Sequence, residues 1–200
     1  IKEYINCGDE YTIEEKLISL HEYCYYYDNN QNNIEIKGIL TNEAGIKYIM
    51  HKLKEDNDTL DAIFCISSPS AKKKMIYDNN TVADITHIDF FKKRLSLYCE
   101  EENIETPLYL LKDNLEIDDN PTSESLINLS ARVANEIIEL KKKNVDKQIN
   151  LYIESNGGIR DFMLIVVAII QSINKEIASI KEVIGVNFNI SEPKYPICNK

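Results

Sequence analysis

The chain has 200 residues, enough for one domain with a hydrophobic core of its own. Its 33 acidic residues outnumber 23 basic ones, and the formal net charge of -10 argues against a general coat for duplex DNA or RNA, which needs a basic face. A local basic pocket for one small anionic ligand remains compatible with this charge. The five cysteines are scattered and contain no CxxC pair, as expected of a reduced, cytoplasmic protein.

The first part of the chain predicts a strand, a hairpin and a helix. Residues 15–20 are a short strand candidate. Residues 22–40 predict a hairpin, because β-forming segments flank the turn sequence DNNQNN. Residues 41–54 predict a helix that begins with Thr41 or Asn42 as N-cap and carries its apolar residues on one face.

Strands and helices continue to alternate along the rest of the chain. The expected strands are 60–67, 107–111, 148–154 and 182–188, and the expected helices are 84–102, 123–143 and 161–175. This order predicts a Rossmann-like α/β domain: a mainly parallel sheet with helices on both faces and a β-hairpin insertion near the N-terminus. We expect residues 1–190 to form this domain. Residues 191–200 carry two prolines and predict a linker or tail towards an effector domain.

The most specific loop follows the strand at 148–154. It reads Ser155-Asn156-Gly157-Gly158, and Arg160 stands in the first turn of the next expected helix. Adjacent glycines let the backbone approach a ligand closely, and the N–H groups at a helix start attract an anion. The loop contains neither a Walker A sequence nor GxGxxG, so a nicotinamide dinucleotide is not favoured. A tight turn with a surface arginine would also explain these residues.

Two further loops and one histidine are candidate ligand contacts. Ser67, Ser68 and Ser70 stand at the end of the strand expected at 60–67 and precede three lysines, which predicts either a polyanion pocket or a solvated loop. Thr41 and Asn42 form the second loop, where a capping role for either residue explains the sequence. The functional alternative is that Asn42 contacts a base edge or a ribose. His21 follows the first strand, where it would face the ligand crevice.

No catalytic or metal-binding pattern is present in the sequence. HxxxH, HExxH and GxSxG are all absent, so metal chemistry and nucleophilic hydrolysis have no support from motifs. The longest apolar run, residues 162–170, is about half the length that a membrane span needs, so we expect no membrane segment. We likewise expect no cofactor.

Three segments in this order resemble the CRISPR-associated Rossmann fold (CARF) family. They are TNEAGIKYIM at 41–50, LDAIFCISS at 60–68 and LYIESNGGIRDF at 151–162, and the resemblance spans roughly residues 16–189. SNGGIR is the most specific part. Glu154 stands where the family commonly has aspartate, and Gly45 where it commonly has proline.

The resemblance implies a sensor for cyclic tetra- or hexa-adenylate, a second messenger of type III CRISPR antiviral defence. Such domains dimerise, and one ring lies across the two-fold axis, which suits a ring of even symmetry. The strongly apolar helix expected at 162–173 also favours a homodimer. The resemblance implies that Gly157 and Gly158 offer backbone N–H groups to phosphate or ribose, and that Arg160 lies near a phosphate or braces the loop. It also implies contacts to adenine or ribose from Ser67, Ser68 and Asn42.

The resemblance also implies an effector domain elsewhere in a full-length chain, often a ribonuclease with an RxxxxH motif. No RxxxxH occurs here, so we expect an isolated, non-catalytic sensor. Two alternatives stay open. One is a ring nuclease that slowly cleaves its own cyclic ligand, and the other is a nucleotide-binding domain of a transcriptional regulator.

Overall fold

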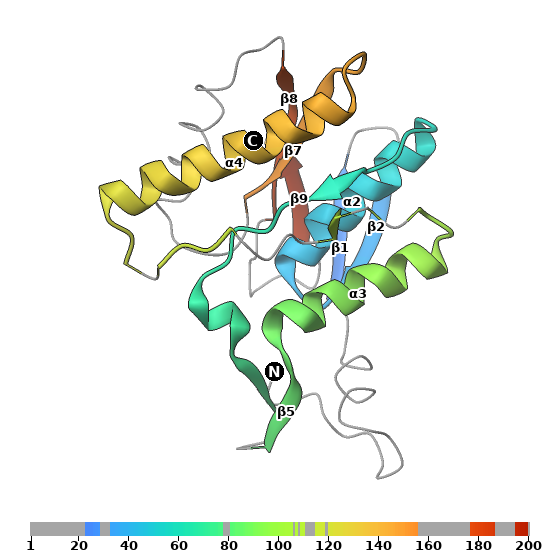
Figure 1. The fold of residues 1–200 in the computed structure, drawn as a ribbon. Coiled ribbons are helices and arrows are strands. Elements are labelled where there is room, and N and C mark those ends of the chain that lie inside the picture. The colour runs from blue at the N-terminus through green and yellow to red at the C-terminus, as the bar shows by residue number, and fades with distance from the viewer. Residues whose placement is uncertain are drawn as a thin grey trace.

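A computed structural model gives the fold of the chain (Figure 1). It describes residues 23–28, 33–77, 81–105, 107, 109–110, 115–118, 120–155, 177–186 and 195–199. The strand expected at 15–20 and the helix expected at 161–175 lie outside these residues. Within the described ranges, no helix has the length and apolar character required to cross a membrane.

A five-stranded sheet forms the centre of the described structure. Its strand order is β2-β1-β9-β8-β7. The bounds are β1 Tyr23–Asp28, β2 Asn33–Gly38, β7 Ile149–Glu154, β8 Ala178–Val186 and β9 Tyr195–Asn199. β1–β9 and β7–β8 pair parallel, whereas β1–β2 and β8–β9 pair antiparallel. The sheet is therefore mixed within the described residues.

The expected hairpin at 22–40 is confirmed as β1 and β2. The two strands pair from Tyr23↔Gly38 to Asp28↔Asn33. Tyr25 lies opposite Ile36 in this register, and both side chains are buried. One face of the hairpin thus contributes directly to the core.

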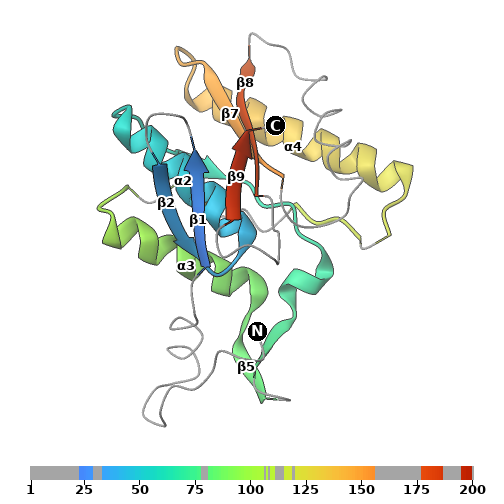
Figure 2. The same ribbon diagram turned by 180° about the vertical axis from the view of Figure 1, so that it is seen from behind.

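Helix α2, Thr41–Glu55, confirms the helix expected at 41–54 and packs on one face of the sheet (Figures 1 and 2). One set of its side chains joins the sheet core, which contains Tyr25, Ile36, Ala44, Tyr48, Ile49, Leu53 and Ile184. Ile46 and Met50 point instead into a second cluster shared with helix α3. α2 is therefore buried on two sides, between the sheet and α3.

Helix α3, His87–Glu101, begins three residues later than the start expected at residue 84. The Thr86 side chain caps it by accepting a hydrogen bond from the Asp89 backbone N–H. Residues before this cap form β5, Thr81–Thr86, which pairs antiparallel with β4, Lys74–Tyr77. This second hairpin was not predicted from the sequence.

A short parallel pair joins β3, Ala62–Ile63, to β6, Tyr109–Leu110. The strands expected at 60–67 and 107–111 are thus present in shortened form. A further parallel bridge connects Ser67 with Glu116, beyond the carboxyl ends of both strands. A 3₁₀ helix, η1 at Pro69–Lys72, follows.

Helix α4, Ser123–Lys143, matches the helix expected at 123–143. The Thr122 hydroxyl accepts a hydrogen bond from the Ser125 backbone N–H, and Glu124 occupies the first turn. Three lysines at 141–143 occupy the last turn, where the helix dipole favours cations. α4 lies at the periphery of the described structure (Figures 1 and 2).

The segment expected to leave the domain as a tail differs in the structure. Residues 195–199 form β9, which lies between β1 and β8 inside the sheet. Pro196 aligns with Tyr26 in the parallel pair with β1. Proline donates no ladder hydrogen bond and is unusual inside a sheet, which is why the sequence pattern indicated a linker.

Candidate functional site

Hydrogen bonds at the end of β7 hold Ser155, the first residue of the loop at 155–158. Ser155 directly follows β7, and both its backbone N–H and its hydroxyl donate to the Ile184 carbonyl oxygen, each at 2.9 Å. The start of the loop is therefore fixed to the neighbouring strand β8. Asn156, Gly157, Gly158 and Arg160 lie outside the described residues, as does His21.

The first turn of α2 is capped differently from the prediction. Leu40, not Thr41 or Asn42, is the N-cap residue, and its side chain makes no cap hydrogen bond. The Asn42 side chain instead accepts from the Glu43 backbone N–H at 3.1 Å. Glu43 supplies the cap, because its carboxylate accepts from the backbone N–H groups of Leu40 and Ile39.

The end of β7 lies against the first turns of α2. A Cβ atom added to Gly45 would lie only 2.6 Å from Cγ of Glu154. A side chain at position 45 would therefore force the Glu154 side chain to move. The contact brings Ser155, which follows Glu154, to the same region as the Thr41–Asn42 end of α2.

We expect a strong energetic coupling between Gly45 and Glu154. Gly45→Ala gains about 1 kcal/mol of helix propensity, but overpacking against Glu154 costs about 1–3 kcal/mol. In a Glu154→Ala background the overpacking is absent, so only the gain in helix propensity should remain. Urea unfolding of the double-mutant cycle measures this difference. Gly38→Ala is the control, since its added Cβ meets neighbours at 3.5–3.6 Å and should show no coupling to Glu154→Ala. Equal effects of Gly45→Ala in both backgrounds would contradict the contact.

The serine loop lies at the carboxyl ends of β3 and β6. Ser67 is buried, its backbone N–H donates to the Leu115 carbonyl, and its own carbonyl accepts from Ile117. The Ser68 and Ser70 hydroxyls hydrogen bond to each other, and Ser70 is exposed. The loop thus has one buried anchor and two hydroxyls nearer to solvent.

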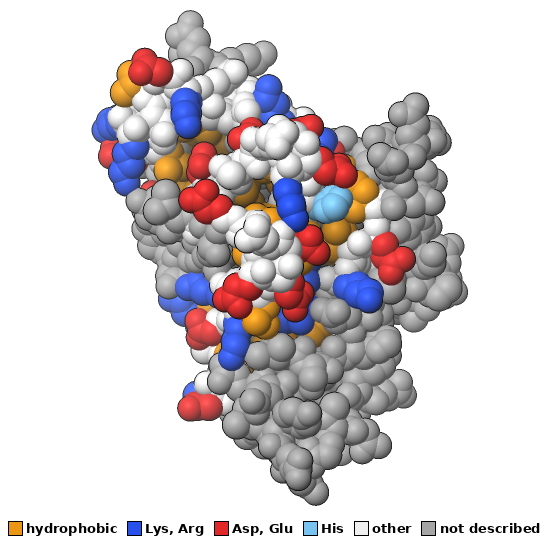
Figure 3. Space-filling view, turned by 90° about the vertical axis from the view of Figure 1, so that its right-hand side faces the viewer, with side chains coloured by type: hydrophobic (Ala, Val, Ile, Leu, Met, Phe, Trp, Pro, Cys, Tyr) orange, Lys and Arg blue, Asp and Glu red, His pale blue; other side chains and the backbone are white. Residues whose placement is uncertain are grey.

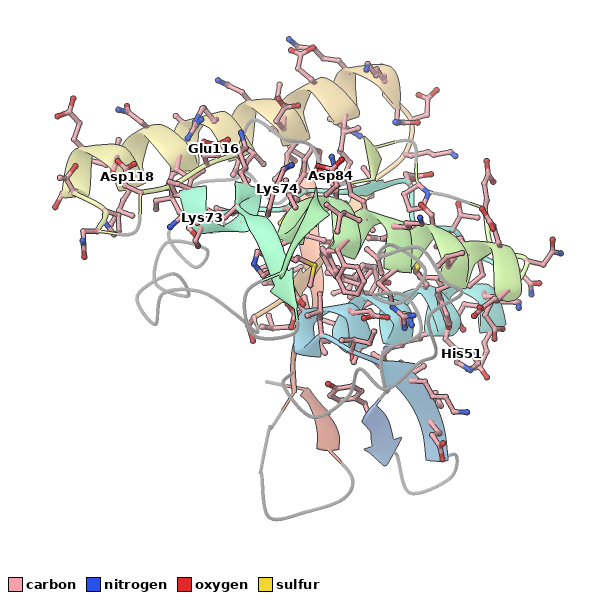
Figure 4. The ribbon with its side chains drawn as sticks, turned by 90° about the horizontal axis from the view of Figure 1, so that it is seen from below. His51, Lys73, Lys74, Asp84, Glu116 and Asp118 are labelled. Carbon is pink, nitrogen blue, oxygen red and sulfur yellow. The ribbon has the colours of Figure 1, made fainter. Side chains whose placement is uncertain are left out.

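The lysines behind this loop are engaged by acidic side chains. Lys72 forms an ion pair with Glu116, and Lys74 forms one with Asp84. The hydrogen bond from Lys74 lowers the pKa of the Asp84 carboxyl below its ordinary value. Lys73, Lys74 and Asp84 lie on one side of the described structure near Glu116, while His51 lies well apart (Figure 4). Two of the three cations are therefore already paired, which weakens the prediction of a polyanion pocket here.

A shallow hollow adjoins the serine loop. Its volume is about 230 Å³, and its lining residues are Pro69, Glu116, Ile117, Asp118, Ser125, Asn128 and Arg132. The Arg132 guanidinium donates to the Glu116 carbonyl oxygen at 2.7 Å. The hollow is smaller than the roughly 300–1,000 Å³ of typical ligand pockets. Its own walls could hold only part of a nucleotide-sized ligand.

Two of the candidate segments, the end of β7 and the start of α2, meet at the N-terminal half of α2, whereas the 3₁₀ helix of the serine loop packs on α3. The end of β7 meets Gly45 on one side. On another side, Leu40 and Ala71 pack against the cluster that contains Ile46. Strand ends and helix starts gathered in this way are the usual place for a ligand in an α/β fold.

Comparisons with protein-family models, curated proteins and solved structures find no match to this chain. Within the described residues, no group of three or more His, Cys, Asp and Glu side chains is placed to hold a metal ion. Acidic and basic side chains are interspersed on the face shown in Figure 3, with no extended patch of one sign among its described residues.

A buried charge network beneath the first turn of α2 was not anticipated from the sequence. Glu43 is fully buried, and its Oε1 accepts from Lys47 Nζ at 2.6 Å and from Arg94 Nε and Nη2 at 3.0 and 2.9 Å. Its Oε2 accepts from the backbone N–H groups of Ile39 and Leu40. One carboxylate thus balances two nearly buried cations and caps the helix.

The same network ties three elements together. Lys47 donates to the Lys37 carbonyl in β2 at 2.8 Å, and its ammonium lies 5.0 Å from the centre of the Tyr98 ring in α3. Burial raises the pKa of the Tyr98 phenol, and the negative charge of the Glu102 carboxylate raises it further, so the phenol stays neutral. The i,i+4 spacing of Glu43 and Lys47 was a readable signal, but the sequence does not reveal that Arg94 joins them.

Proposed function

We propose that this chain is a Rossmann-like sensor domain that binds a cyclic oligoadenylate, of four or six units, at a homodimer interface. In a full-length protein, binding would control an effector domain in type III CRISPR antiviral defence. The proposal rests on the CARF-like motifs and on their order in the chain. The observation that carries it is the contact of Glu154 with Gly45, which joins the start of the SNGG loop to the TNEAG helix start.

The chemistry of the loops supports an adenylate ring as ligand. Consecutive glycines at 157 and 158 would offer backbone N–H groups to phosphate or ribose. Arg160 would form a charge-assisted bond to a phosphate. Ser68, Ser70 and Asn42 are each at least partly accessible and would contact adenine or ribose.

The net charge of the chain does not oppose this ligand. Only the pocket needs to be positive, and a compact ring carries few phosphates compared with a duplex. A two-fold dimer can also give both halves of a four- or six-unit ring the same contacts. A single chain would meet only half of such a ring.

A panel of ligands tests the proposal by melting temperature. We expect cyclic tetra- or hexa-adenylate, at about 100 times its Kd, to raise Tm by roughly 5–10 °C. Linear oligoadenylate and NAD should produce little shift. A shift with NAD and none with either ring would contradict the proposal. Mass spectrometry of the ring after incubation separates the alternatives, because a sensor returns it intact and a ring nuclease returns linear products.

A further inference from the structure

Helix α4 carries two apolar stripes, and only one of them faces the core. Leu129 and Ile137 are buried, and Leu126 and Val133 pack beside them. The second stripe lies on another side of the helix. It consists of Ile127, Ala131, Ala134 and Ile138, and we call it the outer stripe.

The outer stripe is open to solvent. Ile127 is 68% exposed and Ile138 is 37% exposed. Ala131 is exposed and Ala134 is half-buried. The spacing of i, i+4, i+7 and i+11 places all four residues on one narrow line along the helix. Such a line is typical of a helix that packs against a second helix.

The outer stripe reads the same from both ends. Isoleucine, alanine, alanine and isoleucine follow one another with gaps of three, two and three residues. We infer that the outer stripe of α4 is a contact between two copies of this chain, with the helices antiparallel about a two-fold axis midway between Ala131 and Ala134. Ile127 then packs on the partner's Ile138, and Ala131 on the partner's Ala134. Small residues at the centre allow the two helices to approach closely.

The charges at the ends of α4 select this orientation. Glu124 occupies the first turn, and Lys141, Lys142 and Lys143 occupy the last. An antiparallel partner brings Glu124 next to the partner's Lys141 and the partner's Lys142, and this happens twice by symmetry. A parallel partner would align acid with acid and lysine with lysine. Charge complementarity therefore favours a second copy in the antiparallel register.

The hollow described above is lined in part by α4. Ser125, Asn128 and Arg132 line it, and their helical spacing places them on a side of α4 different from that of the outer stripe. The inference deepens the proposed function and rests on it for the expectation that a ligand is shared by two chains. The contact itself requires only the residues of α4.

Sedimentation equilibrium at about 1–100 µM tests the contact. We expect the wild-type chain to dimerise and Ala131→Arg to raise the dimer Kd at least about tenfold, because two guanidinium groups would meet near the axis. Glu101→Arg, which places the same new charge at an exposed position of α3, is the control and should leave the dimer intact. Circular dichroism checks that each variant keeps its helices.

A charge exchange tests the register. Glu124→Lys and Lys142→Glu should each weaken the dimer, and the double variant should restore it. A monomeric wild type, or a dimer that survives Ala131→Arg, would overturn the inference. Ring binding measured on the same samples separates the two proposals. If the ring binds and Ala131→Arg leaves the dimer unchanged, only the α4 contact is refuted. If the dimer depends on α4 and binds no ring, only the proposed function is refuted.

Discussion

Replacing Glu43 by alanine is expected to lower the free energy of unfolding by about 3–5 kcal/mol, the cost of leaving buried charges without their partner. Glu43 is fully buried and balances Lys47 and Arg94, which are themselves nearly buried. Its removal also leaves two backbone N–H groups at the start of α2 without their acceptor. Urea unfolding followed by circular dichroism measures the loss.

Two comparisons sharpen the Glu43 prediction. Arg94→Met should cost less than Glu43→Ala, because one carboxylate and one ammonium remain as a balanced pair. Glu101→Ala, at an exposed position of α3, is the control and should change stability by no more than about 0.5 kcal/mol. A Glu43→Ala protein as stable as the Glu101→Ala protein would show that the network contributes nothing.

Gly158→Val is expected to abolish binding of the cyclic oligoadenylate while the domain stays folded. A valine side chain would fill the space through which a ribose or phosphate reaches the backbone, and it disfavours the positive φ that glycine permits. Calorimetric titration measures binding, and thermal melting of the same sample measures the fold. If Tm falls sharply and binding falls only with unfolding, the glycines serve the turn alone.

Arg160→Ala provides the second arm of this test. Loss of a charge-assisted hydrogen bond to phosphate should weaken binding by roughly 1.5–3 kcal/mol. Lys181→Ala is a control that removes a cation from an exposed position of β8. Binding that survives Arg160→Ala unchanged would remove the arginine from the site and leave the loop backbone as its contribution.

Local patterns predicted the elements with strong periodicity or clear end signals. The hairpin β1–β2 followed from β-forming runs around a polar turn. Helix α2 followed from its apolar spacing, although its N-cap is Leu40 and not Thr41 or Asn42, and α4 followed from its cap and the charges at its ends. The β4–β5 hairpin and β9 were missed. β4 follows a lysine-rich loop and β9 contains Pro196, and both obtain their stability from pairing partners that a local pattern does not contain.

The candidate site was predictable only as separate pieces. The sequence indicated that Ser67 and Ser155 follow strands, and the structure places both there. The contact of Glu154 with Gly45 connects positions far apart in the chain, so no spacing rule predicts it. The pairing of Lys72 with Glu116 is equally non-local, and it changes the expected charge of the serine loop.

The central claim is that one cyclic oligoadenylate is shared by two copies of this chain. Isothermal titration calorimetry of the wild-type chain with cyclic tetra-adenylate and cyclic hexa-adenylate tests it most directly. We expect saturable heat with one of the two rings, at a stoichiometry of one ring per two chains. No heat with either ring, or one ring bound per single chain, would contradict it.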